Sequence, residues 1–310
     1  MQAVWVDGFG EPEVLVARET PDPVAGAGEV VIRVAAASVT FIETAIRAGR
    51  GPRPGAGPRP PYVPGNGVAG VVVQVGAGVD EGWLGRRVAS ATGGTGGYAS
   101  RVSAPVSELI PVPDRLDLTE AAALFADGRT ATGLVELAAP QAGEVVLVLA
   151  AAGGVGTLLV QLAAPARVIG AAGGPKLSAV RDLGADAVDY TVPGWSAALP
   201  PIDVAFDGVG GTVGAEALRA VRPGGRFVMF GLSSGAPTAV DRDDVTVIGW
   251  PALSALGARS HELTRRAFAN EALRPVIGQT FPLADAARAH AAIEARTTTG
   301  KTLLIPDSDR

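Results

Sequence analysis

One stretch of this 310-residue chain constrains its fold more than any other, because residues 145–166 carry no charged side chain. A run of that length could span a bilayer, but several glycines, Gln161 and Pro165 interrupt it. A short apolar strand, here VVLVLA, followed by a Gly-rich turn and an apolar helix is instead what a buried parallel sheet requires. We therefore predict a strand–turn–helix unit within an α/β sheet.

The rest of the chain shows two patterns that meet near residue 119. Before that point, short β-branched runs bounded by Gly, Pro and Asp favour an all-β, barrel-like domain; they are AVWVD, VVIRVAAASV, GVVVQVG and GRRVAS. After it, strands such as RVIGAA and DAVDY alternate with helical segments, which indicates a doubly wound parallel sheet. The predicted domains are residues 1–118, completed by a returning segment at 277–310, and residues 119–276.

Two helices and one loop stand out within these domains. LTEAAALFADGRTATGLVELA has the opening and apolar spacing of an amphipathic helix, and LADAARAHAAIEAR predicts a second helix near the C-terminal end. Residues 49–65 alternate Pro and Gly and can form neither a ladder nor a helix, so we expect an irregular surface loop. Such a loop is either a functional lid or an insertion with no role, and both readings stay open.

The composition narrows the class of partner. A net charge of -5 provides no basic surplus to neutralise phosphates, so we expect a small-molecule ligand and neither nucleic acid nor a membrane. The chain has no cysteine, which excludes disulfides, thiolate nucleophiles and Cys-based zinc sites, and its histidines are His261 and His290. The N-terminal segment lacks the basic start and apolar run of a signal peptide, so we expect a mature, cytoplasmic protein.

The turn after VVLVLA fits the dinucleotide-binding fingerprint. In that fingerprint the first small residue makes the tight turn, the second admits the pyrophosphate to the backbone, and the third allows close helix packing. Ala151, Gly153 and Gly156 occupy these positions. Together with Gly154 and Val155 they would direct helix N–H groups at the phosphates. The alternative is a Gly-rich turn that merely permits packing.

The choice of dinucleotide follows from the end of the second strand of this unit, RVIGAAGGPK. Enzymes that prefer NAD commonly hold the ribose 2′-OH there with Asp or Glu. None is present in this segment, since Gly173 and its neighbours leave the corner open, while Lys176 provides a cation suited to a 2′-phosphate. NADPH is therefore favoured over NADH. The alternative for Lys176 is an ordinary solvated lysine.

Further segments occur in order along nearly the whole chain: VTFIETAIRAG, PGNGVAGVVVQVG, GGYAS, AAAGGVG, LGADAVDY, AFDGVGG, FGLSSG and RTTTGKTLLIP. As an ordered set they resemble the zinc-independent quinone oxidoreductases, a group of medium-chain dehydrogenases/reductases that includes zeta-crystallin. The resemblance implies an α/β protein with a GroES-like β-barrel catalytic domain and a Rossmann doubly wound parallel-sheet domain. It also implies a cofactor lying between the domains and a homodimer.

The same resemblance implies roles for particular residues. Lys176, Tyr190 and Arg296 would surround the 2′-phosphate. A further set would line the cofactor: Thr130, Gly231 and Ser233. The alternatives are a packed strand-end residue for Tyr190 and a solvated helix-end charge for Arg296.

Departures from the family's pattern bear on metal and substrate. Zinc-dependent relatives use Cys and a Gly-His-Glu segment where this chain has Asn66 and Gly67, so no metal site is expected. Thr40, Glu43 and Ala45 replace the family's Asn, Asp and Tyr, which line the substrate side in relatives. The sequence therefore leaves the identity of the substrate open.

The favoured function is NADPH-dependent, metal-free reduction of a quinone. Thr40, Tyr62 and the 249–260 segment would contact the substrate, although Tyr62 could equally be a loop-packing aromatic. Asp127, in FADGRTA, is either a buried proton donor near the nicotinamide or a partly solvated helix charge. A quinone needs no protein acid, because its reduced oxygens can take protons from water.

Two rival functions remain open at this point. The first is reduction of an activated C=C bond in an enone, as in enoyl or alkenal reductases, for which Tyr62, Glu43 or Asp127 would supply a proton. The second is a non-catalytic NADPH-binding role, since zeta-crystallin shows that this fold can serve a structural purpose.

Overall fold

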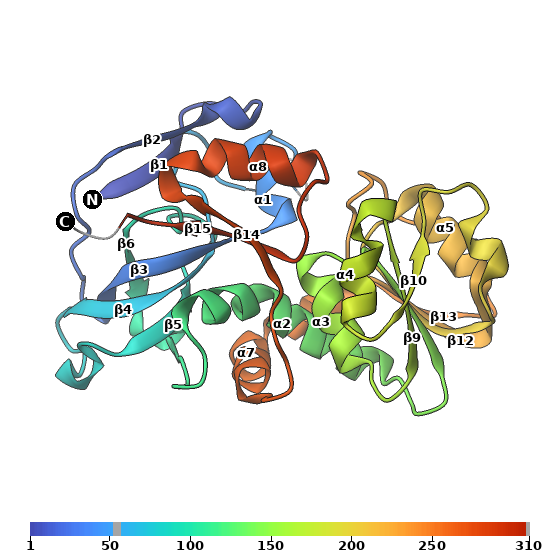
Figure 1. Ribbon diagram of the computed structural model, residues 1–310. Coiled ribbons are helices and arrows are strands. Elements are labelled where there is room, and N and C mark those ends of the chain that lie inside the picture. The colour runs from blue at the N-terminus through green and yellow to red at the C-terminus, as the bar shows by residue number, and fades with distance from the viewer. Residues whose placement is uncertain (52–56, 308–310) are drawn as a thin grey trace. The chain divides into compact units, whose positions relative to one another are not determined.

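The computed structural model describes residues 1–51 and 57–307, and the chain divides into two compact units (Figure 1). The first unit comprises residues 1–126 and 277–310, and the second comprises residues 127–276. The first unit is thus assembled from both ends of the chain, with the second unit inserted between them in sequence.

The first unit is built on a mostly antiparallel sheet that the C-terminal segment completes. Its strand order is β14-β15-β3-β4-β5-β7, with β6 also paired to β3, and a separate ribbon joins β1 to β2. β15 runs parallel to β14 and antiparallel to β3. The elements are β1 (Gln2–Val6), β2 (Leu15–Glu19), β3 (Glu29–Val39), α1 (Phe41–Arg47), β4 (Gly67–Val75), β5 (Arg87–Ala91), β6 (Arg101–Pro105), β7 (Ile110–Pro111), β14 (Ile277–Pro282), α8 (Ala286–Glu294) and β15 (Lys301–Ile305).

The core of this unit explains why these runs are strands. Val30, Ile32, Val72 and Leu304 are almost fully buried in one cluster with residues of β1 and α8. Each such side chain stabilises the fold by about 1.5–3 kcal/mol on burial. The β-branched runs expected at the sequence level are confirmed as β1, β3, β4 and β5.

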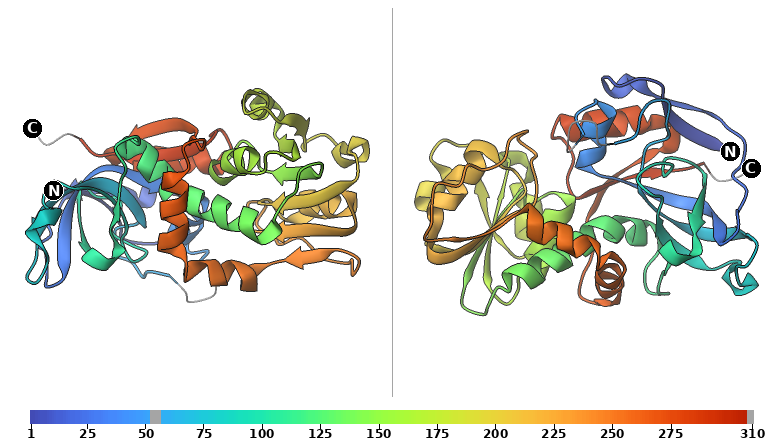
Figure 2. Two further views of the ribbon diagram at one scale, coloured as in Figure 1. Left: turned by 90° about the horizontal axis from the view of Figure 1, so that it is seen from below. Right: turned by 180° about the vertical axis from the view of Figure 1, so that it is seen from behind.

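The second unit is a wholly parallel sheet with strand order β10-β9-β8-β11-β12-β13. The order reverses between β8 and β11, which in open α/β sheets marks the place where ligands bind at the carboxyl ends of strands. Helices flank the strands in both views of Figure 2. The elements are β8 (Val145–Leu149), α3 (Gly154–Leu162), β9 (Arg167–Ala172), α4 (Leu177–Asp182), β10 (Asp186–Asp189), β11 (Ile202–Asp207), α5 (Gly211–Ala220), β12 (Val221–Met229), β13 (Thr246–Ile248), α6 (Trp250–Gly257) and α7 (Ser260–Ala269).

The uncharged stretch 145–166 forms the predicted strand, turn and helix. Leu147 and Leu149 of β8 are fully buried, and Leu158 and Leu159 of α3 are at most 1% exposed. Within the described ranges, no helix is both long and apolar enough to cross a bilayer. The stretch is therefore apolar because it lies inside the α/β sheet.

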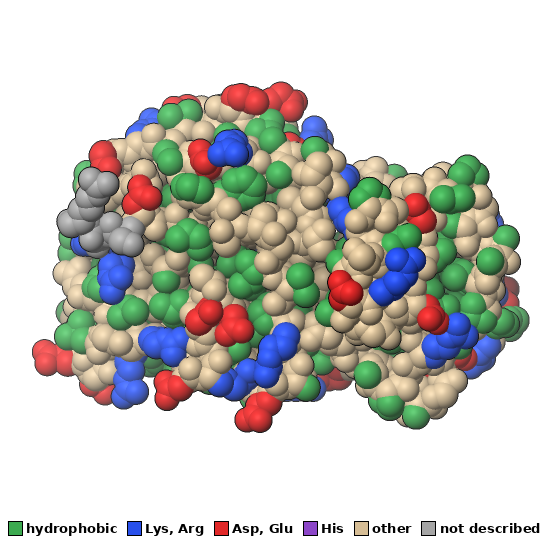
Figure 3. Space-filling model, in the orientation of Figure 1, with side chains coloured by type: hydrophobic (Ala, Val, Ile, Leu, Met, Phe, Trp, Pro, Cys, Tyr) green, Lys and Arg blue, Asp and Glu red, His purple; other side chains and the backbone are tan. Residues whose placement is uncertain are grey.

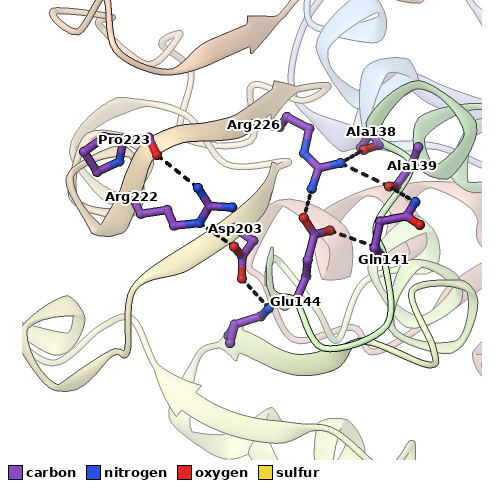
Figure 4. A network of polar contacts seen from close by, with 9 residues as sticks. Ala138, Ala139, Gln141, Glu144, Asp203, Arg222, Pro223 and Arg226 are labelled. Carbon is purple, nitrogen blue, oxygen red and sulfur yellow. Dashed lines mark hydrogen bonds and ion pairs between the residues drawn. The ribbon is translucent and has the colours of Figure 1, made fainter.

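Helix α2 (Leu118–Ala138) has the bounds expected from its sequence, and polar contacts fix its end (Figure 4). The guanidinium of Arg226, on β12, donates to the carbonyl oxygens of Ala138 at 2.6 Å and Ala139 at 3.0 Å. It also pairs with the carboxylate of Glu144, which precedes β8. These contacts satisfy carbonyls that a helix end leaves without partners, so they tie α2 to the parallel sheet.

Two surface features complete the description. Of the predicted loop 49–65, residues 57–65 contain no helix, whereas residues 52–56 lie outside the described residues. On the face seen in Figure 3, acidic and basic side chains are interspersed. That face accordingly presents no broad field of one sign.

Candidate cofactor and substrate sites

The turn between β8 and α3 is held tightly by its own backbone. Ala150 has a left-handed backbone with φ 53°, which an L-residue rarely adopts. The N–H of Gly153 donates to the Ala150 carbonyl at 2.8 Å, and the N–H of Ala151 donates to the carbonyl of Ala171 on β9 at 3.0 Å. The turn is thereby anchored to the neighbouring strand, and the first turn of α3 starts at a fixed place.

The glycines of this turn, here called the cradle, leave space that the side chain of any other residue would occupy. A Cβ at Gly156 would lie 2.2 Å from the Ala150 carbonyl oxygen, far inside contact distance, and one at Gly153 would lie 3.2 Å from it. Gly153, Gly154 and Val155 are partly exposed, so ligand atoms can reach the N–H groups there. The local geometry fits a pyrophosphate seated on the helix start, as the fingerprint predicts.

The other candidate cofactor residues of the second unit, apart from Thr130, lie at the same carboxyl edge. Gly173 and Lys176 follow β9, and Tyr190 follows β10. The N–H of Tyr190 donates to the Ala172 carbonyl at 3.3 Å. Beyond β12, the N–H of Ser233 donates to the Gly208 carbonyl at 3.3 Å. Gly231 approaches the same loop so closely that a Cβ there would lie 2.5 Å from the Gly208 oxygen. Thr130 lies in α2 and is partly exposed.

Asp207, which the sequence did not single out, organises the loop at the end of β11. Its Oδ1 accepts the N–H groups of Val209 and Gly210, each at 2.8 Å, and its Oδ2 accepts the hydroxyl of Thr238 at 2.5 Å. The side chain is 1% exposed. Its place next to the switch point makes it a support for the cofactor edge, and its position directly after the apolar run IDVAF was the available signal.

A second acidic residue was also missed, and it lies beside the corner described as open. Asp189 ends β10 and is the register partner of Ala172, the last residue of β9. Hydrogen bonds from the hydroxyl and the N–H of Thr191 hold the pKa of Asp189 below its usual range, and the carboxylate also lies against Gly174. The segment RVIGAAGGPK itself contains no acidic residue, as the sequence shows. Pairing of β10 with β9 nevertheless places the carboxylate of Asp189 beside it.

In the first unit, the buried carboxylate of Glu43 links the segment that contains Thr40, a candidate substrate residue, to the segment that contains Asn66. Glu43 of α1 accepts the N–H of Thr40 on Oε2 at 2.7 Å and the N–H of Asn66 on Oε1 at 3.0 Å. The hydroxyl of Tyr98 donates to Oε2 at 3.1 Å. Burial raises the pKa of Glu43, while the Thr40 amide and the charge of Lys301 oppose that rise. Since its oxygens already accept from three donors, Glu43 acts as a positioning residue for Thr40 and Asn66.

Tyr98 extends this cluster to His290 on α8. The Tyr98 hydroxyl lies 2.9 Å from Nε2 of His290, and both side chains are fully buried. Tyr98 has one proton, so the arrangement that satisfies both contacts has Nε2–H donating to the hydroxyl and the hydroxyl donating to Glu43. Burial, and then the charge of Arg47, lower the pKa of His290 from 6.5 to about 3. The imidazole is therefore neutral near pH 7.

Tyr62 differs from its neighbours because its hydroxyl is buried without a hydrogen-bond partner among the described residues. Its backbone bridges to Val6, with N–H···O distances of 2.9 and 3.1 Å, and the residue is 7% exposed. Burial raises the pKa of the phenol. Thr40 caps the start of α1 and is partly exposed. A buried hydroxyl requires a partner, so Tyr62, like Ser38, Arg47 and His290 of the same unit, has hydrogen-bonding capacity that the described residues do not use.

The remaining candidates have distinct surroundings. Arg296 follows α8 with a left-handed φ of 59°, is exposed, and holds its guanidinium 4.5 Å from the ring centre of Phe41. Asp127 is only 7% exposed, so the interpretation of a partly solvated helix charge is wrong. The packing around α2, which the residue type does not reveal, excludes water from it. Trp250 opens the 249–260 segment and is 45% exposed.

Asn66, at the position where zinc-dependent relatives bind their metal, makes a hydrogen bond to the backbone. The side-chain oxygen of Asn66 accepts the N–H of Gly94 at 2.7 Å. Across residues 1–51 and 57–307, no three His, Cys, Asp or Glu side chains gather in a way that could hold a metal ion. Asn66 therefore serves the local backbone.

Two features of this fold define a class of protein. One is the parallel sheet of this strand order with a glycine cradle at its switch point, and the other is the mostly antiparallel unit made from both ends of the chain. The class is the dinucleotide-binding oxidoreductases with a Rossmann unit and a GroES-like unit. Family profiles agree: residues 26–114 match the alcohol dehydrogenase GroES-like domain, and residues 183–304 match the zinc-binding dehydrogenase family.

Individual relatives narrow the class. The chain is 34% identical to a quinone oxidoreductase from Pseudomonas aeruginosa, covering 96% of this chain and 97% of the relative. It is 30% identical to a 2-haloacrylate reductase from Burkholderia sp, covering 99% and 100%. The solved Escherichia coli quinone oxidoreductase complexed with NADPH superposes with a TM-score of 0.88 at 29% identity, covering 99% and 100%. The chain belongs to the quinone oxidoreductase family of medium-chain dehydrogenases/reductases. The resemblance and fold class inferred from sequence are thus confirmed.

Proposed function

We propose that this protein catalyses the NADPH-dependent two-electron reduction of a quinone-like acceptor without a metal. The observation that supports this proposal best is the tight glycine turn at the start of α3, where a Cβ at Gly156 would lie 2.2 Å from the Ala150 carbonyl oxygen and Gly153 is partly exposed, with Lys176 just after the adjoining strand. The NADPH complex of the Escherichia coli relative supports the same coenzyme. Lys176 and Tyr190 are proposed to bind the 2′-phosphate from the second unit. Arg296 is proposed as a further cation for the same phosphate.

The reaction balances with simple chemistry. NADPH supplies a hydride from its nicotinamide ring, and the quinone with that hydride and one proton becomes the hydroquinone. The chain's part is to bind the coenzyme, orient the acceptor and exclude water, which can lower a barrier strongly without an acid or base. Thr40, held by Glu43, and the unpaired hydroxyl of Tyr62 are proposed to contact the acceptor's oxygens.

The proposal is tested by steady-state turnover of a benzoquinone and a naphthoquinone with NADPH. Lys176→Ala is the diagnostic variant, and Arg181→Ala, which removes an exposed cation from α4, is its matched control. Loss of a charge-assisted contact should raise the Kd of NADPH by about tenfold and that of NADH far less. Absence of quinone turnover with every quinone tried would refute the assignment. Equal effects of the two variants would refute the role of Lys176.

A second candidate is reduction of an activated C=C bond, favoured by the buried phenol of Tyr62 and by the 2-haloacrylate reductase relative. Protonation beside the carbonyl needs a donor, whereas a hydroquinone can be protonated by water. Tyr62→Phe should therefore reduce enone turnover by about a hundredfold and change quinone turnover little. Robust enone turnover without quinone turnover would establish this second function. Reduction of any acceptor dye would remove the non-catalytic alternative.

We further propose a homodimer in the cytoplasm. Strand β13 pairs on one side with β12 and ends the parallel sheet, and such an edge can pair with another chain. Light scattering coupled to size-exclusion chromatography measures the mass directly, and a mass of one chain at all concentrations would refute the dimer. Fractionation of cells would test the compartment.

A further inference from the structure

The carboxylate of Asp189 touches the backbone corner expected to receive the coenzyme's ribose. A Cβ added at Gly174 would lie 2.6 Å from Asp189 Oδ2, so that carboxylate oxygen lies directly against the residue after Gly173. In dinucleotide-binding folds, the residue about twenty positions past the glycine turn contacts the ribose 2′-OH. Asp189 therefore occupies, from β10, the place that an acid on β9 holds in enzymes that prefer NAD.

The same carboxylate also builds the turn that carries Lys176. Its Oδ1 accepts the N–H of Thr191 at 2.9 Å and the Thr191 hydroxyl at 2.6 Å. Its Oδ2 lies against Gly174, at the start of the segment in which the Lys176 N–H donates to the Gly173 carbonyl at 2.9 Å. The hydrogen bonds from Thr191 hold the pKa of Asp189 below its usual range, so the carboxylate is ionised at neutral pH, and the residue is partly exposed. Asp189 thus positions a cation while placing a negative charge beside it.

These two effects act in opposite directions on the two coenzymes. Ordering of the turn favours NADPH, because the turn carries Lys176, the cation proposed to bind the 2′-phosphate. The charge, in contrast, repels the 2′-phosphate of NADPH and can accept a hydrogen bond from the 2′-OH of NADH. The charge of Asp189 therefore favours NADH, whereas its hydrogen bonds, which hold the turn of Lys176, favour NADPH.

We propose that Asp189 is a coenzyme-specificity residue, which limits the preference for NADPH and keeps NADH usable. The inference rests on the proposed function only in requiring that the chain bind these coenzymes. It predicts that neutralising this one side chain increases discrimination in favour of NADPH.

The test is equilibrium binding of NADPH and NADH, followed by the fluorescence of the reduced nicotinamide, with no acceptor present. Asp189→Asn removes the charge and keeps a side-chain oxygen. Asp186→Asn is the matched control for charge, because Asp186 begins the same strand and is ion-paired to Arg167 at the opposite edge. Thr191→Val is the control for the turn, because it removes a donor to Asp189 and leaves the charge.

In about 20 mM salt, Asp189→Asn should raise the ratio of the NADH Kd to the NADPH Kd by about fivefold, and screening should reduce this to under about twofold in 0.5 M salt. Thr191→Val, which loosens the turn and keeps the charge, should weaken NADPH binding without raising this ratio, and Asp186→Asn should leave the ratio unchanged. A ratio unaltered by Asp189→Asn, altered equally by Asp186→Asn, or altered independently of salt would overturn the inference alone. Wild-type protein that binds neither coenzyme would overturn the proposed function as well.

Discussion

Replacing His290 with Gln should abolish a loss of stability that the wild-type protein suffers in mild acid. His290 is fully buried, its Nε2 lies 2.9 Å from the Tyr98 hydroxyl, and its Nδ1 has no hydrogen-bond partner within the described part of the chain. Protonation would place a positive charge among these groups and near the buried Arg47. Gln cannot titrate, so the variant lacks this dependence on pH.

The magnitude follows from the pKa, which burial lowers from 6.5 in the unfolded chain to about 3 in the folded one. Between these values the unfolded state binds a proton that the folded state does not, so stability falls as pH falls. The contribution is fully present above pH 6.5 and decreases by about 1.4 kcal/mol per pH unit below it. At pH 5 the loss reaches about 2 kcal/mol.

Glu43, in the same cluster, has the opposite effect on how stability depends on pH. Its pKa is raised, so the stability it contributes is present at low pH and is lost as pH rises through the folded value. Both the wild type and His290→Gln retain Glu43, and the difference between their pH profiles therefore isolates the histidine. The profile should be compared between about pH 7.5 and pH 5, on either side of the unfolded pKa of histidine.

Urea unfolding followed by circular dichroism measures the profile, and His261→Gln serves as the control because His261 is partly exposed. Since the chain has only two histidines, NMR can also follow each ring separately, with the control variant giving the assignment. The reasoning fails if His290→Gln keeps the wild-type slope between pH 7.5 and 5, or if the ring of His290 titrates near its ordinary pKa of about 6.5.

Three further substitutions probe the fold and the cradle. Gly65→Ala should destabilise the first unit by more than about 2 kcal/mol, because φ is 93° and a Cβ would lie 2.4 Å from the Tyr98 ring; thermal melting gives the loss. Arg226→Ala should cost about 1–3 kcal/mol by leaving carbonyls at the end of α2 and the carboxylate of Glu144 without their donor, and an unchanged urea midpoint would contradict this. Gly156→Val should abolish NADPH binding in a fluorescence titration and also lower the melting temperature, because its Cβ would lie 2.2 Å from the backbone carbonyl oxygen of Ala150; retained affinity would argue against the cradle.

Local signals in the sequence were sufficient for most of the fold. Helix α2 and strand β9 have the expected bounds because apolar spacing and flanking Gly and Pro determine them nearby in the chain. The glycine cradle was also predictable, since each position of the fingerprint has its own steric reason. Domain class therefore followed from periodicity and a single well-placed motif.

Interactions between distant residues were not predictable in this way. Tyr98 and His290 are 192 positions apart, and neither has a neighbour in sequence that indicates a buried polar partner. Asp189 was missed for a related reason, because only the register of two parallel strands places it against Gly174. The burial of Asp127 likewise depends on packing around its helix and not on its own segment.

The pairing of β15 with β3 has a consequence for synthesis of the chain. Residues 302–304 lie against residues 37–39, so this end of β3 lacks one of its strand partners until almost all of the polypeptide has been made. The inserted unit is contiguous in sequence and can fold on the ribosome while its host still lacks a strand. During that interval the end of β3 exposes backbone groups that could pair with a neighbouring chain, so completion of the sheet by β15 also protects this protein from pairing with other copies during synthesis.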